Sequence, residues 1–407
     1  MGAADEIRRR IAAAGPIPFA EFMERALYGP GGYYARREAT TGPAGDFSTS
    51  PDVSPAFGRR LAVQLAEIRE RAGGGPWTLA ELGPGRGLLA ADILDGLAAH
   101  APEALAALGR LLLVERSPAL AARQLRRLAG HPHAPPRMES VEALPPGAGR
   151  DGPLIVVANE LFDALPVHVL IREPGGGLAE LHVGLDRAGS LVEVPAPPGD
   201  PDLVALVERY GLCPRPGDRA EVCPALERQV AALAEAGAIA ALVVDYGHRA
   251  ARLASPELAD GTLVAYRAHR VVRDVLADPG AQDITAHVNW DHLADAGRAA
   301  GYEVLGPVPQ DRFLVALGVL DDAVRDGGDE SPPHLAARLA ARALILPGPG
   351  GGRRFQALAL VRPGLGPLRG FSPPRPPAAG PADVPDRGRE RPHGRTNRRG
   401  PGGAVPR

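Results

Sequence analysis

Residues Trp77 to Gly87 read WTLAELGPGRG, and this stretch decides the fold. The apolar run Trp77 to Leu82 has the composition of a buried strand, and three glycines follow it. Leu89, Ile93 and Leu97 then recur every four residues, which is typical of one face of a helix. A strand, a glycine turn and a helix form the first half of a nucleotide-binding βαβ unit, because glycine allows positive φ angles and close approach of a ligand.

The spacing of the glycines narrows the class of ligand. Gly83, Gly85 and Gly87 alternate, whereas a dinucleotide fingerprint separates its last two glycines by three residues. Glu81 lies two residues before the first glycine. We interpret this E-x-G-x-G-x-G pattern as a loop for the amino-acid end and sulfonium of S-adenosylmethionine. The alternatives are an incidental loop and, more remotely, a nicotinamide oxidoreductase.

Composition and charge exclude several classes of protein. The chain has 407 residues, 45% of them hydrophobic, and a net charge of −2, which gives no reason to expect nucleic acid as a partner. It has no run of eighteen apolar residues, so no membrane span is predicted, and its start lacks an apolar signal sequence. Cys213 and Cys223 form neither a disulfide framework nor a C-x-x-C pair, which predicts a reducing, cytoplasmic location. The histidines fit no ligand spacing, so no metal site is predicted.

Two acidic residues beyond the glycine loop are candidates for binding the nucleoside. Glu115 closes the apolar strand Arg110 to Glu115, where a carboxylate accepts hydrogen bonds from the ribose hydroxyls in nucleotide-binding units. Glu139 is a weaker candidate for the adenine side. A solvated acid without a ligand is the alternative for each.

Polar residues after the strand Leu154 to Ala158 are the best catalytic candidates. Asn159, Glu160 and Asp163 follow this strand, and carboxyl strand ends face the ligand crevice in doubly wound sheets. The alternative is a helix cap with an acidic first turn. Asp46 lies in a polar loop, residues 42–58, that is more polar than a connection requires. If the methyl acceptor is a guanidinium, carboxylates are needed to orient it, because arginine stays protonated.

The rest of the chain predicts three regions. Residues 1–75 form an N-terminal helical segment, whose tyrosine loop, Tyr28 to Tyr34, is either a lid or substrate wall or a packed surface loop. Residues 76–362 form a methyltransferase domain with a β-rich insertion at 165–235, where the hydrophobic period becomes two. Residues 249 to 290 are predicted to be rich in loops. Residues 363–407 are dominated by Pro, Gly and Arg and predict a disordered tail.

Seven segments, in order, resemble the MidA-type methyltransferases, the family that includes the mitochondrial protein arginine methyltransferase required for complex I assembly. They are YGPGGYY, GDFSTSPDVSPAFG, ELGPGRG, NELFDALPVH, VDYGH, DITAHVNWDHL and RRFQALAL, and they span roughly residues 15 to 362. The resemblance implies a Rossmann-like class I α/β fold: a mostly parallel seven-stranded sheet with helices on both faces and an antiparallel insertion.

The resemblance also implies roles for single residues. Gly83, Gly85 and Gly87 match the cofactor loop, and Glu115 matches the ribose acid. Asn159 and Glu160 would lie against the reacting centre, although the mitochondrial member has His before this Glu. The implied activity is S-adenosylmethionine-dependent methylation of a protein arginine, with a respiratory-complex subunit as one candidate acceptor and a homodimer as a further hypothesis. A non-catalytic assembly protein and a small-molecule methyltransferase are the alternatives.

Overall fold

The computed structural model describes residues 2–35, 42, 45–321, 331–346 and 354–372. Residues Met1–Ser372 form one compact unit. From residue 373 onward, the predicted disordered tail lies outside the described residues.

The central sheet confirms the predicted fold class. Its seven main strands follow the order β15-β16-β10-β5-β2-β3-β4, and the short β14 pairs with β10. The five strands from β10 to β4 are parallel, whereas β16 runs antiparallel to both of its neighbours. The strands are β2 (Trp77–Leu82), β3 (Leu108–Val114), β4 (Arg137–Val141), β5 (Leu154–Asn159), β10 (Ala238–His248), β14 (Val288–Asn289), β15 (Glu303–Pro309) and β16 (Phe355–Val361).

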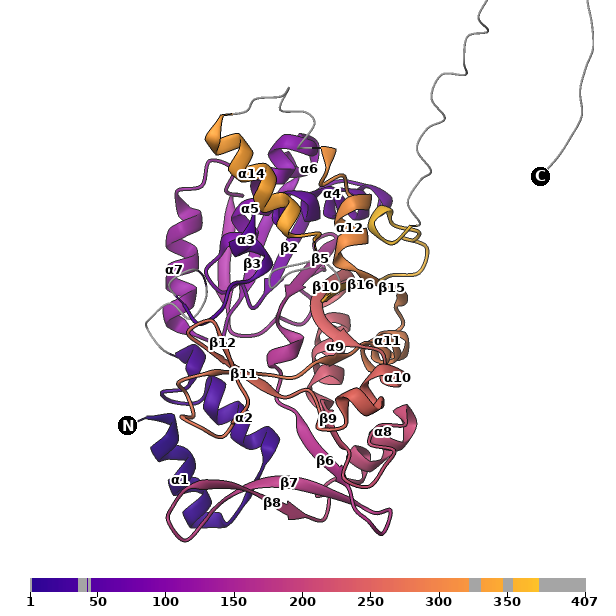
Figure 1. The fold of residues 1–407 in the computed structure, drawn as a ribbon. Helices are drawn as coiled ribbons and strands as arrows, with labels where there is room; N and C mark the ends of the chain where they lie inside the picture. The colour runs from indigo at the N-terminus through magenta and orange to yellow at the C-terminus, as the bar shows by residue number, and fades with distance from the viewer. Residues whose placement is uncertain (1, 36–41, 43–44, 322–330, 347–353, 373–407) are drawn as a thin grey trace, which may run out of the picture. The chain divides into compact units, whose positions relative to one another are not determined.

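Helices cover both faces of this sheet (Figure 1). On one face, α4 (Ala56–Arg71), α5 (Leu88–His100) and α12 (Gln310–Ala316) share a core with Ile155 and Val157 of β5. On the other face, α9 (Pro224–Ala236) and α11 (Trp290–Ala299) pack on Val156 of the same strand. Neighbouring residues of a strand point to opposite faces, so two covered faces require a continuous apolar run, which is what the sequence shows.

The predicted antiparallel insertion is a second sheet. Its order is β1-β7-β6-β9, with β8 paired to β7. The edge strand β1 comes from the N-terminal segment, and the helices of that segment share its apolar core. The predicted N-terminal and inserted regions therefore build one layer. Its elements are α1 (Ala3–Ala14), β1 (Ile17–Pro18), α2 (Phe19–Tyr28), β6 (His168–Arg172), β7 (Leu178–Leu185), β8 (Leu191–Ala196), α8 (Pro201–Tyr210) and β9 (Arg219–Val222).

The segment predicted to be rich in loops, residues 249 to 290, contains a third sheet, so this prediction is wrong in part. The sheet has the order β12-β11-β13. Its strands are short, β11 (Val264–Arg267), β12 (Arg270–Val272) and β13 (Asp283–Thr285), and a strand of three or four residues gives little periodicity to detect. The remaining described elements are α3 (Ser50–Val53), α6 (Pro102–Ala106), α7 (Pro118–Ala129), α10 (Ala250–Leu253), α14 (Pro332–Ala343), η1 (Tyr33–Ala35), η2 (Phe162–Ala164), η3 (Pro256–Leu258) and η4 (Arg369–Phe371).

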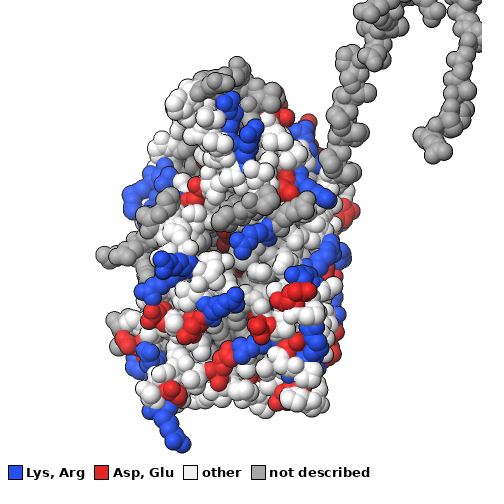
Figure 2. Space-filling view, viewed as in Figure 1, with Lys and Arg blue, Asp and Glu red and all other residues white. Residues whose placement is uncertain are grey.

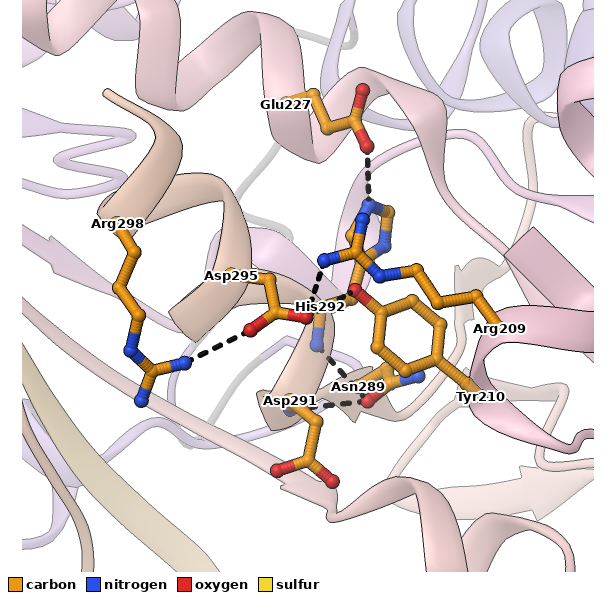
Figure 3. A network of polar contacts seen from close by, with 8 residues as sticks. All are labelled: Arg209, Tyr210, Glu227, Asn289, Asp291, His292, Asp295 and Arg298. Atoms are coloured by element: carbon orange, nitrogen blue, oxygen red, sulfur yellow. Dashed lines mark hydrogen bonds and ion pairs between the residues drawn. The ribbon is translucent and has the colours of Figure 1, made fainter. Parts of the chain in front are cut away.

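A polar network joins the insertion to the helices of the central sheet (Figure 3). Asp295 of α11 accepts hydrogen bonds from Arg209 at 2.7 Å and from Tyr210 at 3.1 Å, both at the end of α8. The His292 ring, also on α11, lies 2.9 Å from Glu227 of α9. The contacts of Asp295 tie the end of α8 to α11, which packs on the central sheet.

Ordered structure continues past the predicted boundary of the tail at residue 363. Leu365 and Leu368 are buried, and Gly370 donates a backbone hydrogen bond to Gln64 Oε1 of α4 at 2.9 Å. The leucines pack against the core that lies over α4 and α5. Composition placed the boundary too early because two apolar residues suffice to anchor a Pro- and Gly-rich segment.

Candidate active site

The glycine loop lies between β2 and α5, at the carboxyl edge of the parallel strands. Its three glycines have positive φ angles, among them 63° at Gly83 and 49° at Gly85. A Cβ atom at Gly83 would lie 2.9 Å from Leu161 Cδ1, whereas one at Gly85 would meet nothing within 4 Å. Gly83 thus allows the loop to pack on the segment after β5, and Gly85 leaves its backbone open to a ligand.

A cavity of about 510 Å³ borders the loop, a volume typical of sites for small ligands. We call it the large cavity. It opens where ligands bind in doubly wound sheets, at the carboxyl strand ends, with the N-terminal tyrosines and α9 as further walls. Its lining residues include Tyr28, Tyr34, Gly83, Gly85, Glu115, Glu142, Leu144, Glu160, Leu161 and Arg228.

Glu115 lies directly after β3 and lines the large cavity, as predicted for an acid that binds ribose. Its Oε1 atom accepts the backbone N–H of Ser117 at 2.8 Å, and its Oε2 atom accepts Gln124 Nε2 at 2.9 Å. The same Nε2 atom donates to the carbonyl of Gly85 at 2.8 Å. Gln124 therefore couples the glycine loop to the carboxylate, and each carboxylate oxygen keeps a lone pair for a hydroxyl donor.

The structure does not bring Glu139 into the large cavity. This exposed side chain stands within β4 and forms two hydrogen bonds with Arg110, at 3.0 and 3.1 Å. Glu142 lines the cavity instead. It follows the last residue of β4, and only residues at or beyond the carboxyl end of a strand face the crevice.

A second cavity, of about 80 Å³, lies on the other side of the glycine loop. We call it the small cavity. Four residues line both cavities and mark the place where they meet: Tyr34, Gly83, Gly85 and Glu160. Further residues of the small cavity include Phe47, Thr49, Asp52, Glu81, Arg86 and Asn159.

Three buried polar atoms of the small cavity lack a hydrogen-bond partner among the described residues. Glu81 Oε2 and Asn159 Oδ1 are acceptors, and Arg86 Nε is a donor. Buried polar atoms are normally satisfied, so such atoms indicate a missing partner. An α-amino acid offers an ammonium group and a carboxylate, which matches this set. The small cavity thus fits the amino-acid end of S-adenosylmethionine, and the large cavity fits its nucleoside.

Glu81 is the most buried acid of the small cavity, with 3% of its surface exposed. Burial raises the pKa of its carboxyl group to about 8, against a smaller lowering by a hydrogen bond from the backbone of Ala90 in α5. A cation beside Glu81 would favour the charged form.

Glu160 lies at the junction of the two cavities in an unusual backbone conformation. Its φ angle is 50°, rare for a residue other than glycine, and strain of this kind is concentrated at functional sites. The donors to its Oε1 atom are neutral: the backbone N–H of Ser50 at 3.0 Å and Asn159 Nδ2 at 3.1 Å. Burial raises the pKa of Glu160 to about 8.

Asp163 lies behind Glu160, as one of three deeply buried acids. It hydrogen-bonds to the Tyr246 hydroxyl, and burial raises its pKa to about 6. Asp245 anchors the segment after β5, because its Oδ2 atom accepts the backbone N–H groups of Leu161, Phe162 and Asp163. Asp283 accepts the Tyr34 hydroxyl at 2.9 Å. These three acids hold the surrounding backbone and tyrosines through hydrogen bonds, and they are absent from the described lining of both cavities.

Asp46 is likewise outside the described lining of both cavities. It accepts the Tyr33 hydroxyl at 3.0 Å and the backbone N–H of Ala268 at 2.8 Å, and so ties the tyrosine loop to the hairpin of β11 and β12. In the same polar loop, Asp52 pairs with Arg86 of the glycine loop and lines the small cavity. The loop therefore reaches the site through Asp52 and Ser50.

Sequence reasoning missed several residues that line the cavities or hold their walls. Gln124 had a signal, since this polar residue stands between Leu120 and Leu128 on the buried face of α7. Glu142 directly follows β4, and its position would have indicated a cavity residue if this strand had been recognised in the sequence. Arg86 stood inside the quoted glycine motif but was read as a spacer.

A glycine loop between a strand and a helix, with cavities at the carboxyl ends of the parallel strands that Glu115 and Glu160 line, is typical of a class I S-adenosylmethionine-dependent methyltransferase. Residues 58–308 match the family described as "Putative S-adenosyl-L-methionine-dependent methyltransferase". The chain belongs to this family, which confirms the predicted enzyme class and cofactor.

Individual relatives support the assignment. The chain is 31% identical to the mitochondrial protein arginine methyltransferase NDUFAF7 of Xenopus tropicalis, over 76% of this chain and 74% of that protein. It is 32% identical to the Drosophila melanogaster homologue, with the same coverage. A Burkholderia thailandensis protein solved with S-adenosyl-homocysteine is 33% identical, with a TM-score of 0.82 over 91% of this chain and 94% of that one.

These comparisons overturn the predicted cytoplasmic location, because the curated relatives are named as mitochondrial. Cysteine use indicates only a reducing environment and does not distinguish one reducing compartment from another.

No helix among the described residues is both long and apolar enough to cross a membrane. On the face shown in Figure 2, acidic and basic side chains are interspersed over much of the surface.

Proposed function

We propose that the chain transfers methyl groups from S-adenosylmethionine to an arginine guanidinium of a protein. Relatives named as protein arginine methyltransferases support this proposal. The observation that carries it is Glu160, a partly buried carboxylate at the junction of the two cavities whose hydrogen-bond donors are neutral. A carboxylate that receives hydrogen bonds only from neutral donors is suited to bind a cationic methyl acceptor that donates N–H bonds.

The chemistry requires an oriented nucleophile. The cofactor supplies a methyl carbon made electrophilic by the sulfonium. Glu160 would accept N–H bonds from the guanidinium and hold one nitrogen in line with the breaking C–S bond. Nitrogen attack would form the N–C bond, the electrons of the C–S bond would remain on the neutral sulfur, and the proton lost by the attacking nitrogen would pass to the Glu160 carboxylate.

Neighbouring residues would set the orientation and the protonation of the Glu160 carboxylate. Asn159 donates to Glu160 and fixes its rotamer. Asp163 adds negative charge behind it and contributes to its raised pKa. A cationic acceptor would lower that pKa on binding, so Glu160 would be charged when the acceptor is present.

The substitution Glu160→Gln tests the proposal. We expect turnover to fall at least about a hundredfold, while S-adenosyl-homocysteine affinity changes less, because the amide cannot orient a cation. Glu142→Gln, on the nucleoside side of the large cavity, is the matched control and should raise the KM for the donor with little loss of kcat.

The assay is transfer of radioactive methyl groups to proteins of a lysate, followed by hydrolysis and analysis for methylarginine. Label in metabolites alone would replace the proposal with a small-molecule methyltransferase, and binding of the cofactor without any labelling would favour an assembly protein. A respiratory-complex subunit as acceptor and a homodimeric state stay hypotheses, which mass spectrometry of the labelled band and sedimentation would test.

A further inference from the structure

The tyrosine loop has a place in the site that the proposed acceptor chemistry does not use. Tyr34 lines both cavities, so its side chain stands where the nucleoside and amino-acid ends of the cofactor must join. In S-adenosylmethionine that joining atom is the sulfonium, which carries the positive charge. We propose that the Tyr34 ring is a cation–π wall for this charge and makes the site prefer the charged donor to its neutral product.

The ring is held in place by contacts on several sides. It stacks on Tyr28, with centroids 5.4 Å apart and an angle of 20° between the planes, and it meets Tyr33 edge-on at 5.1 Å. Its hydroxyl donates to the buried Asp283 carboxylate at 2.9 Å. The Asp283 oxygen accepts this hydrogen bond and fixes the orientation of the ring. A ring fixed in this way needs no reordering when the ligand binds.

The charges around the junction agree with this role. Glu160 is the other side chain shared by the two cavities, and it bears an acid group. Arg116 lies over the ring of Tyr28, 4.7 Å from its centroid, and is paired with Glu24. Arg116 is thus engaged by Tyr28 and Glu24, and Tyr34 lines the junction together with Glu160. Aromatic faces recognise onium ligands through the ring quadrupole.

A charge-specific comparison tests the proposal without acceptor or turnover. Affinities for S-adenosylmethionine and S-adenosyl-homocysteine are measured by titration calorimetry on wild type, Tyr34→Phe and Tyr34→Leu. We expect Tyr34→Leu to weaken S-adenosylmethionine binding by about five- to thirtyfold while S-adenosyl-homocysteine changes less than about twofold. Tyr34→Phe keeps the ring and should retain most of the preference.

The control is Leu144→Ala, which removes an apolar contact from the large cavity alone. It should weaken both ligands equally. Equal weakening of both ligands by Tyr34→Leu would overturn the proposal and make the ring a steric wall, and unchanged affinities would also overturn it. Should Tyr34→Leu fail to fold, loss of the preference in Tyr34→Phe would overturn the proposal as well.

Discussion

At the scale of single residues, Glu81 has a consequence for pH. Its folded pKa of about 8 lies above the ordinary value for glutamate, so its charged form is disfavoured in the free protein. An ammonium group bound beside it would restore the charge, and binding would release a proton at neutral pH. We expect S-adenosyl-homocysteine affinity to rise with pH up to about 8, by up to about tenfold per unit.

Calorimetry in two buffers of different ionisation enthalpy measures this proton release, and the neutral sulfur of S-adenosyl-homocysteine excludes an effect of the sulfonium. Glu81→Gln should bind more weakly and without pH dependence between about pH 6 and 8. Proton release of the same size in Glu81→Gln would show that another group titrates.

The sequence predicted the cavity residues that directly follow the carboxyl end of a recognisable strand. The glycine loop, Glu115 and Glu160 all line the cavities, because residues at carboxyl strand ends meet at one edge of a parallel sheet. Glu139 does not, since its strand extends two residues beyond it. Tyr34 could not be assigned from the sequence, because its position depends on a contact with Asp283, 249 residues away in the chain.

At the scale of elements, the segment after β5 depends on one side chain of β10. Asp245 is fully buried, and its Oδ2 atom accepts backbone N–H groups of Leu161 and Phe162 at 3.1 and 2.8 Å. Burial is the largest cause that raises its pKa, followed by the charges of Asp163 and Glu160. Asp245 therefore holds the segment that begins with Glu160 in place through its backbone.

Removal of this anchor should destabilise the fold and the site together. We expect Asp245→Ala to lower the free energy of unfolding by about 2–4 kcal/mol, because buried N–H groups lose their acceptor. Asp245→Asn keeps one acceptor oxygen and should cost clearly less. Urea denaturation measures both variants. Equal losses in the two would point to the charge of Asp245, and not to the backbone contacts, as the source of stability.

The elements that the sequence failed to predict are short or polar. β9 has four residues and β4 carries alternating charges, so neither shows the apolar run that identified β2 and β5. β11 to β13 are short, and a contact with a distant segment lies beside them, where the backbone N–H of Ala286 donates to the carbonyl of Asp163 at 2.9 Å. Tertiary contacts determine such strands more than local propensity does.

At the scale of the whole molecule, the N-terminal segment belongs to both the inserted sheet and the cofactor site. β1 pairs with β7, and the apolar residues of α2 share a core with that strand. The same segment supplies Tyr28 and Tyr34 to the large cavity, and the Tyr28 hydroxyl donates to the carbonyl of Ala164 at 2.9 Å. A separate lid would not be tied to the sheet and to the segment after β5 at once.

This arrangement predicts that ligand binding protects distant parts of the chain together. With S-adenosyl-homocysteine at about 100 times its Kd, binding adds roughly 2.7 kcal/mol to the stability of the bound state. Because α2 shares its core with β7, we expect the amides of α2 to exchange with solvent more slowly in the bound protein than in the free protein. We expect the same of the amides of the glycine loop. The exposed turn at Asp186 to Ser190 is the control and should not change. Hydrogen exchange read by mass spectrometry measures this, and protection confined to residues 77–165 would instead make the N-terminal segment an independent lid.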